Sequence, residues 1–380
     1  MTDSWKIANC LAILAICCQS AQALQLRVVG PVEDVFRFEF DSCDTYDQPD
    51  APARAFRSHN GNVYLFASHF VNRASVGASL NTVRRDCKVA FRGAGSRDPA
   101  SFDNIAWLAG FFTADGRTVH ALVHNEYHGE QDETRCKSAT AWACWYNSII
   151  HAISLDGGRS FSLRKRPLHL VAAAPVRYSN SSEGRVGAFS PTGIVKFGQY
   201  FYALFVYSDA SRTGICLMRT VSLNEPQSWR AYDGQNFNVR FINPYRTETV
   251  EPRTCSPLDR LIPNTIGALV RHEPSQTFII IQTTPGSNKR PGGVYYSTSN
   301  DLLRWTEPRL LIAAPIFNDF DCSYDKFSFG YGSILDPESS SPSFETIAHS
   351  PYLYLTRFNL EGCRRGKTRD LIRIRLVVEP

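Results

Sequence analysis

The chain has 380 residues, of which 43% are hydrophobic, 12% aromatic and 20% charged, and its formal net charge is +5. This composition supports a large folded core and excludes an intrinsically disordered chain. The charge is small for the length and spread along the sequence. We therefore interpret the basic run 164–166 as a solvated loop and expect no nucleic-acid partner.

The first residues have the pattern of a signal peptide. Lys6 precedes an apolar stretch at residues 7–18, and Ala21-Gln22-Ala23 then supplies a small-x-small cleavage pattern. The apolar stretch is shorter than the about 20 residues that a membrane span requires, and no later stretch is apolar enough. We expect residues 1–23 to be removed and the mature protein, beginning at Leu24, to be secreted or periplasmic without a membrane anchor.

Cysteine usage agrees with export. Three of the eleven cysteines lie in the predicted signal peptide, and the even number that remains indicates a disulfide set. No pair has the C-x-x-C spacing of a zinc ribbon. The sequence leaves the connectivity open, and we expect nearest neighbours to pair: Cys43 with Cys87, Cys136 with Cys144, Cys216 with Cys255, and Cys322 with Cys363.

Short β-rich runs occur along the whole chain. Each is rich in Val, Ile, Tyr and Phe and ends at Gly, Pro, Asn, Asp or Ser, as is typical of strands. The runs are residues 63–67, 118–124, 149–154, 201–207, 278–283, 293–297, 352–358 and 371–378. No segment sustains a 3.6-residue apolar period, so helices should be few. We predict an all-β fold and one domain over residues 24–380.

The strands recur in a repeating unit. One half is an apolar strand, a glycine and a Tyr-rich strand, as in residues 190–205 and, more loosely, 50–66. The other half is an apolar strand, a polar turn and a Trp or Phe, as in residues 153–161, 219–229 and 296–305. An aromatic side chain after such a turn fills the space between neighbouring four-stranded sheets of a β-propeller.

These units resemble the blades of the five-bladed β-propeller glycoside hydrolases of the arabinanase/xylosidase and invertase/inulinase types. Residues 154–161 also resemble the Asp-box of sialidases, S-x-D-x-G-x-[ST]-[WF], which is a structural turn. We expect five blades, beginning near Asp50, Asp103, Gly187, Asp259 and Tyr324. The strand patterns at residues 24–29 and 371–378 should share the last blade and close the ring. A six-bladed propeller is the alternative, because the second blade is long.

Asp50 is the first catalytic candidate. A glycosidase needs two carboxylates on either side of the scissile bond, and the resemblance places a nucleophile or general base at the start of the first inner strand. The invertase-type motif Asn-Asp-Pro-Asn/Asp matches residues 47–52 only in part, so that Asp47 remains an alternative to Asp50. A structural role is also open, since aspartates often cap Pro-rich turns.

The segment His124-Asn125-Glu126-Tyr127-His128-Gly129 is the densest polar cluster. It follows an apolar strand, and we expect it at the strand end or in the following loop. Glu126 is the predicted general acid with a raised pKa, and His124, Tyr127 and His128 are predicted to bind substrate. An exposed hairpin and a metal site formed by His124, Glu126 and His128 are the alternatives.

Three further residues have predicted roles. Asp103 precedes the apolar run 105–108, and the resemblance implies an aspartate near this blade that orients the acid. Arg54 and Arg357 lie in apolar strand contexts, where a guanidinium either pairs with a carboxylate or binds an anionic substrate. The structural alternatives are a strand-start cap for Asp103 and internal salt bridges for the arginines.

We therefore predict a carbohydrate-active enzyme, specifically a monomeric glycoside hydrolase that uses no metal or cofactor and acts on a polysaccharide or oligosaccharide. A polysaccharide lyase with a His/Tyr pair and an arginine is one alternative. A propeller that binds glycans without catalysis is the other, because a fold does not fix a chemistry.

Overall fold

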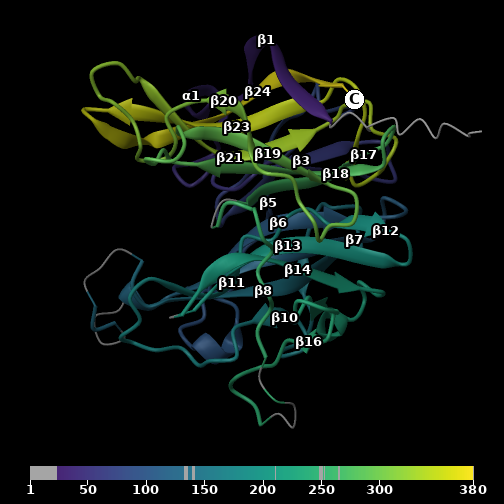
Figure 1. Cartoon of the computed structure of the whole chain (residues 1–380), viewed down its shortest axis with the longest axis vertical. Helices are drawn as coiled ribbons and strands as arrows, with labels where there is room; N and C mark the ends of the chain where they lie inside the picture. The colour runs from purple at the N-terminus through teal and green to yellow at the C-terminus, as the bar shows by residue number, and fades with distance from the viewer. Residues whose placement is uncertain are drawn as a thin grey trace, which may run out of the picture.

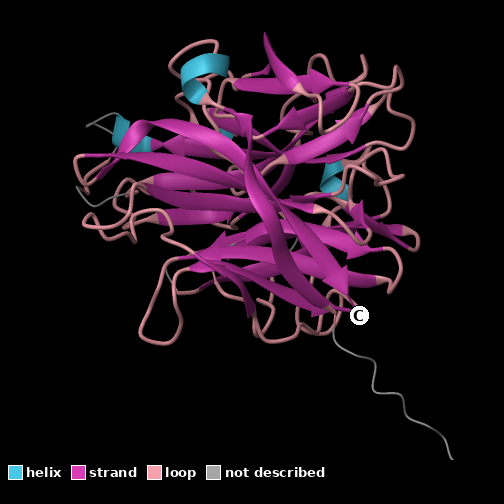
Figure 2. Ribbon diagram, turned by 90° about the horizontal axis from the view of Figure 1, so that it is seen from above, coloured by secondary structure: helices cyan, strands magenta, loops and turns pink. Residues whose placement is uncertain are grey.

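The computed structural model describes residues 24–131, 136–138, 142–209, 211–247, 251, 253–263 and 266–379. The predicted signal peptide lies outside these residues. The described chain is all-β, as predicted, and Figure 2 shows that it consists mainly of strands. Its helices are α1 (Phe38–Asp41) and the single 3-10 turns η1 (Pro99–Ser101), η2 (Gly129–Gln131) and η3 (Pro226–Ser228). None of these is long and apolar enough to cross a bilayer.

The described strands form four hydrogen-bonded sheets. The first has four consecutive antiparallel strands, β2 (Arg54–Arg57), β3 (Val63–Phe66), β4 (Asn72–Gly77) and β5 (Arg84–Phe91). Alternate side chains of β2 and β3 face two different neighbours: Phe56 and Phe66 pack toward β6, while Ala55 and Leu65 pack against the last sheet. This two-sided burial explains why β3, Val63-Tyr64-Leu65-Phe66, is apolar at every position.

The second sheet is the largest and contains two groups of strands. One group is β6 (Ile105–Phe112), β7 (Val119–His128), β8 (Trp145–Ser154), β9 (Ser162–Leu163) and β10 (Leu170–Ala173). The other is β11 (Arg185–Phe189), β12 (Val195–Phe197), β13 (Tyr200–Ser208), β14 (Thr213–Thr220), β15 (Arg230–Ala231) and β16 (Val239–Arg240). Among the described strands, only the parallel pairing of β8 with β11, from Arg185↔Trp145 to Gly187↔Asn147, joins the two groups.

The remaining two sheets contain the C-terminal part of the chain. One has β17 (Ile266–His272), β18 (Thr277–Thr284), β19 (Gly293–Ser299), β20 (Arg309–Ala313) and β22 (Thr346–Ile347). The other has β21 (Phe327–Leu335), β23 (Tyr352–Glu361), β24 (Arg364–Glu379) and β1 (Gln25–Phe36). The sequence predicted that the two terminal strands share a sheet, and β1 pairs with β24 along its length, so they lie side by side (Figure 1).

The three polar turns of the repeating unit each follow a long strand and end on a buried aromatic ring. They join β8 to β9, β14 to β15 and β19 to β20, and their aromatic residues Phe161, Trp229 and Trp305 are at most 8% exposed. Phe161 lies 6.3 Å from Phe56 and 5.7 Å from Phe111, ring centre to ring centre, and thus packs against strands of two different sheets. The predicted role of these aromatic residues as packing between sheets is therefore present in the structure.

Four cysteine pairs lie at disulfide distance. They are the nearest-neighbour pairs, with Cα–Cα separations of 5.5 Å for Cys43–Cys87, 5.7 Å for Cys136–Cys144, 6.1 Å for Cys216–Cys255 and 5.2 Å for Cys322–Cys363. The Cys216–Cys255 bridge ties the strand β14 to the chain that follows β16. Each bridge closes a loop and so reduces the conformational freedom of the unfolded chain.

Candidate active site

The polar cluster 124–129 lies largely within strand β7, which continues to His128. The strand-end prediction is confirmed and the loop alternative is not, because β6 and β8 pair with β7 beyond its apolar part: Glu126 pairs with Ile105 on one side and Asn147 on the other. Since side chains alternate along a strand, His124, Glu126 and His128 share one face. Asn125 and Tyr127 occupy the opposite face.

Glu126 is held between the two histidines. Its Oε2 lies 2.8 Å from His128 Nε2 and its Oε1 3.3 Å from His124 Nε2, and the residue is only 6% exposed. Burial alone would raise the pKa of Glu126, but His124, the hydrogen bond from His128 and the charge of Arg185 outweigh it and hold the pKa below its ordinary value. The predicted raised pKa is therefore wrong for the free site, where Glu126 is ionised.

Aromatic rings and an arginine enclose this face of β7. The ring of His128 stacks on Trp145 at a centroid distance of 4.0 Å, and His124 lies 5.8 Å from Trp107. Burial lowers the pKa of His124, although the charge of Glu126 opposes the shift. The positive charge of Arg185 also favours the ionised form of Glu126.

Asp50 forms the second carboxylate cluster. Its Oδ1 accepts hydrogen bonds from Arg369 Nη1 and from Tyr331 Oη, the latter at 3.1 Å, and its Oδ2 lies 3.4 Å from His69 Nε2. The neighbouring Asp47 instead contacts Arg85 and the amide of Cys43. Of the two aspartates left open by the sequence, Asp50 is the one in a cluster of titratable side chains.

The loop between β3 and β4 positions both Asp50 and His69. The amide of Asp50 donates to Ala67 O at 3.1 Å, and the buried Asn72 anchors the end of the loop to β6. Its Nδ2 donates to Ala106 O at 2.9 Å, and its Oδ1 accepts from Leu108 N at 2.8 Å. These bonds place His69 beside Trp107, at a centroid distance of 6.0 Å.

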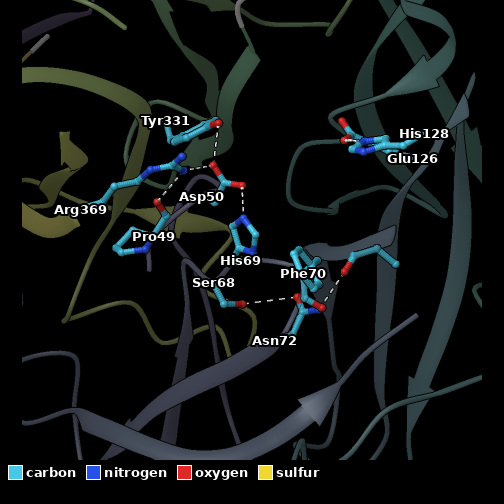
Figure 3. Close-up of polar contacts among 11 residues, drawn as sticks. Pro49, Asp50, Ser68, His69, Phe70, Asn72, Glu126, His128, Tyr331 and Arg369 are labelled. Atoms are coloured by element: carbon cyan, nitrogen blue, oxygen red, sulfur yellow. Dashed lines mark hydrogen bonds and ion pairs between the residues drawn. The ribbon is translucent and has the colours of Figure 1, made fainter. Parts of the chain in front are cut away.

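The Asp50 and Glu126 clusters adjoin one another. Trp107 contacts both His69 and His124. Figure 3 shows the Asp50 group and the Glu126–His128 pair at the two sides of the same region. Burial lowers the pKa of His69, while the negative charges of both Asp50 and Glu126 oppose that shift. The site thus presents two carboxylates with separate basic partners.

Tyr331 and Arg185 complete the surroundings. Burial and the charge of Asp50 raise the pKa of Tyr331 well above its ordinary value, and both Arg369 and Arg185 oppose this effect. The Arg185 guanidinium lies 5.0 Å from the ring centres of both Trp142 and Trp145. Its positive charge also acts to lower the pKa of Glu126 in one cluster and of Tyr331 in the other.

Three predicted site residues lie elsewhere. Asp103 accepts from Arg166 Nη2 at 2.6 Å and from Ala94 N at 2.8 Å, so it fastens the chain before β6. Arg357 is paired with Asp370 at 3.0 Å and with Asp34 at 3.1 Å on the last sheet. Tyr127 donates to Arg97 O at 3.2 Å from the face of β7 opposite to Glu126. These contacts favour the structural alternatives for Asp103 and Arg357.

Arg54 is fully enclosed by protein acceptors. Its guanidinium donates to Ala109 O at 2.9 Å, Ala53 O at 3.0 Å, Ser333 Oγ at 3.0 Å and Gly267 O at 2.5 Å. These acceptors belong to or adjoin β6, β2, β21 and β17. Burial lowers the pKa of Arg54 to about 9, which leaves it charged at neutral pH. These contacts favour a structural role for Arg54, which joins strands through neutral acceptors and not through an ion pair, over the predicted contact with substrate.

The sequence suggested Tyr331 only as an aromatic residue that could bind a sugar face, and it did not indicate His69, Arg369 or Arg185 as site residues. His69 comes shortly after the predicted strand 63–67, and the polar cluster that begins at His124 likewise follows an apolar run. This position after a strand could have indicated His69 as a site residue. The other three come from strands β21, β24 and β11, which are distant in sequence. The described residues include no group of three or more His, Cys, Asp or Glu side chains arranged to hold a metal ion.

No protein-family model and no curated protein sequence matches the chain. Among solved structures, Zg3597, a family 117 glycoside hydrolase from Zobellia galactanivorans, is similar at a TM-score of 0.54 and 8% identity, with 93% of this chain and 90% of that chain covered. A glycosyl hydrolase from Bacteroides ovatus has a TM-score of 0.49 and 9% identity over 92% and 93%. The α-L-arabinanase of Cellvibrio cellulosa has a TM-score of 0.46 and 11% identity, with 86% of this chain and 90% of that chain covered. The first of these establishes that the chain has the fold of a glycoside hydrolase.

Proposed function

We propose that this protein is a secreted or periplasmic, monomeric glycoside hydrolase that cleaves an oligosaccharide or polysaccharide with the carboxylates of Asp50 and Glu126. The single observation that carries the proposal is the pair of adjoining clusters: each carboxylate has its own basic partners, and Trp107 contacts one histidine of each cluster. Two carboxylates in separate environments are what acid–base cleavage of a glycosidic bond requires.

The proposal includes a five-bladed propeller. Consecutive strand groups support it: β2–β5, β6–β10, β11–β16, β17–β20, and β21 with β23, β24 and β1. The parallel contact of three residue pairs between β8 and β11 is the place where the large sheet would divide into two blades. The pairing of β1 with β24 would close the ring and remove free strand edges. The four disulfides favour an exported protein.

Asp50 is the proposed base or nucleophile. Arg369 and the Tyr331 hydroxyl both bind Oδ1, so Oδ2, 3.4 Å from His69, is the oxygen available to a water molecule or sugar carbon. Fixing one oxygen by charge-assisted hydrogen bonds holds the carboxylate in a single orientation, which lowers the entropic cost of reaching the transition state.

Glu126 is the proposed proton donor, acting together with His128. Because Glu126 is ionised in the free site, it must first receive a proton, and the 2.8 Å contact with His128 Nε2 is the route. The His128 ring also lies between two carboxylates, with Nδ1 3.6 Å from Glu130 Oε1. A proton held on the ring would pass along the hydrogen bond to Glu126 and then to the leaving oxygen.

A polysaccharide lyase is the second candidate, because Arg369, His69 and Tyr331 form an arginine–histidine–tyrosine group around Asp50. A lyase needs a base of moderate pKa to remove the proton next to a uronate carboxylate. The pKa of Tyr331 is raised, which makes it a poor base. This shift favours the hydrolase.

The test is a polysaccharide panel assayed for both new reducing ends and the ultraviolet absorbance of unsaturated lyase products. For the hydrolase, Asp50→Asn and Glu126→Gln should each fold normally and lose at least about a hundredfold in kcat. The matched control is Asp156→Asn, in the turn after β8. Full activity of Glu126→Gln would remove Glu126 as donor, and ultraviolet-absorbing products abolished in Tyr331→Phe would establish the lyase.

A further inference from the structure

Two arginines at the candidate site have no carboxylate partner. Arg185 on β11 and Arg365 on β24 form no ion pair and donate no side-chain hydrogen bond within the described part of the chain. Arg369, also on β24, is by contrast paired with Asp50. Removing a charged guanidinium from water without a partner is unfavourable. Such groups at a site are candidates for contact with a ligand.

Arg185 is held by aromatic rings instead of by acids. Its guanidinium lies 5.0 Å from the ring centres of Trp142 and Trp145 and 5.8 Å from that of Phe189, and its buried Nε has no hydrogen-bond partner. Trp142 is 52% exposed, so one side of this stack is open to solvent. A guanidinium fixed by rings keeps its planar donors in a constant orientation, as binding of a carboxylate requires.

Arg365 on β24 is the second arginine without a carboxylate partner among the described residues. It packs over the ring of Phe358 at 5.0 Å, as Arg369 does, and the two are four residues apart on β24. Burial lowers the pKa of Arg365, and the charges of Tyr331 and Asp50 oppose that shift, so its guanidinium is near the Asp50 cluster. Unpaired positive charge is thus present beside both carboxylates.

We propose that the site takes an anionic sugar, whose carboxylate or sulfate group binds the guanidinium of Arg185 or Arg365 while Trp142 stacks on a neighbouring ring. This inference rests on the proposed function, since it specifies the substrate class of the same site. A guanidinium matches the geometry of a carboxylate or sulfate with two parallel hydrogen bonds, and these charge-assisted bonds are stronger than those to a neutral hydroxyl.

The test measures binding, by calorimetry and by tryptophan fluorescence, with paired probes. One pair is an oligogalacturonide and its carboxyl-reduced form, the second an oligoglucuronide and its carboxyl-reduced form, and the third a sulfated galactan oligosaccharide and its desulfated form. At least one charged probe should bind about tenfold or more tightly than its neutral counterpart, and the preference should weaken with added salt. The pair that responds identifies carboxylate or sulfate as the recognised group.

The variants Arg185→Gln and Arg365→Gln should each reduce that preference, and the double variant should abolish it. Arg185→Lys keeps the charge without the planar fork and should restore only part of it. The control is Arg304→Gln, because Arg304 is 92% exposed in the turn after β19 and pairs only with Asp301. Circular dichroism of each variant checks that it is folded.

Equal affinity within every pair, no binding by any charged probe, or an unchanged preference in the double variant would overturn the inference. The outcomes also separate it from the proposed function. A charged probe that binds through Arg185 and yields no product would refute the hydrolase and leave the anionic ligand standing. Cleavage of a neutral glycan, with no preference for charge in binding, would support the hydrolase and refute the anionic ligand.

Discussion

Arg54 and Arg185 begin two strands of the same fold and have opposite surroundings. Arg54 donates to four protein acceptors, and the cavity beside it has a volume of about 20 Å³, enough for about one water molecule. Arg185 stacks on tryptophan rings, and its buried Nε donates to no described group. Both are basic residues among apolar strands, so their type and sequence context do not separate them.

The difference lies in whether the polar atoms are satisfied. A buried group whose donors all have protein partners contributes to architecture, and a ligand could bind it only by breaking those bonds. A group with open donors beside two carboxylates has capacity for a ligand. Arg54 therefore belongs to the joint between sheets, and the proposed function concerns the surroundings of Asp50, Glu126 and Arg185.

The largest expected effect tests the architectural half of this comparison. Arg54→Met should lower the free energy of unfolding by about 3 kcal/mol, because three carbonyls and a hydroxyl lose their buried donor. Urea denaturation at pH 7 measures it, with Arg304→Met as the exposed control. The activity of the fraction that remains folded should be unchanged. An unaltered unfolding midpoint would show that the Arg54 bonds do not hold the sheets together.

A buried histidine pair should make stability depend on pH. His120 Nδ1 lies 3.1 Å from His151 Nε2. Burial lowers the pKa of His120 to about 4, and burial with the charge of His120 lowers that of His151 to about 3, from an ordinary value of 6.5. Because the unfolded chain binds these protons more readily, stability should be level above pH 6.5 and fall as the pH drops toward 4.

The expected loss between pH 6.5 and 5.5 is about 2 kcal/mol for the two histidines together, measured by urea denaturation at each pH. In the double variant His120→Gln/His151→Gln the curve should be flatter, since neither group titrates. The exposed His59, changed to Gln, is the matched control. A double variant with the same acid dependence as the parent chain would assign the effect to other groups.

The sequence predicted what depends on local patterns. Alternating apolar runs identified the strands, the polar turns identified Phe161, Trp229 and Trp305 as packing residues, and nearest-neighbour spacing matched the cysteine pairs that the structure contains. The sequence also drew attention to Asp50 and to the His124–Glu126–His128 group, the latter because polar residues at the end of an apolar run are costly to bury. Their catalytic roles remain predictions.

What the sequence could not supply depends on long-range contacts. Arg369 reaches Asp50 across 319 positions of sequence and Tyr331 reaches it across 281. The length of β7 was underestimated because its last residues are polar, although β6 and β8 pair with them. The pKa of Glu126 was predicted in the wrong direction, since burial was apparent from the sequence and its three basic neighbours were not all recognised.

Arg369 tests the functional half of the comparison, with a smaller expected effect than Arg54. Arg369→Met should lower kcat about tenfold and leave KM nearly unchanged, because Arg369 orients Asp50 and is not proposed to touch the substrate. The unfolding midpoint should stay close to that of the parent chain, and Arg369→Lys should restore part of kcat. A raised KM with normal kcat would instead make Arg369 a substrate contact.

The smallest expected effect concerns the polar turn after β8. Asp156 accepts hydrogen bonds from Ser154 Oγ at 2.7 Å, Ser160 N at 3.0 Å and Ser160 Oγ at 2.7 Å. Burial alone would raise its pKa, but these bonds hold the pKa below its ordinary value of 3.8. Asp156→Asn removes the charge that two hydroxyls stabilise and should cost about 0.5–1 kcal/mol of stability without affecting kcat.

Because the stabilisation belongs to the ionised carboxylate, it is present above pH 3.8 and is lost as the pH falls through the lower pKa of the folded state. The difference between Asp156→Asn and the parent chain should therefore shrink in acid. Asp301→Asn is the matched variant, since Asp301 accepts from Ser299 Oγ at 3.1 Å and Arg304 N at 2.8 Å in the equivalent turn after β19. If Asp156→Asn lost activity while its stability was normal, this turn would belong with the site around Asp50 and Glu126, and the division between satisfied and open polar groups would fail there.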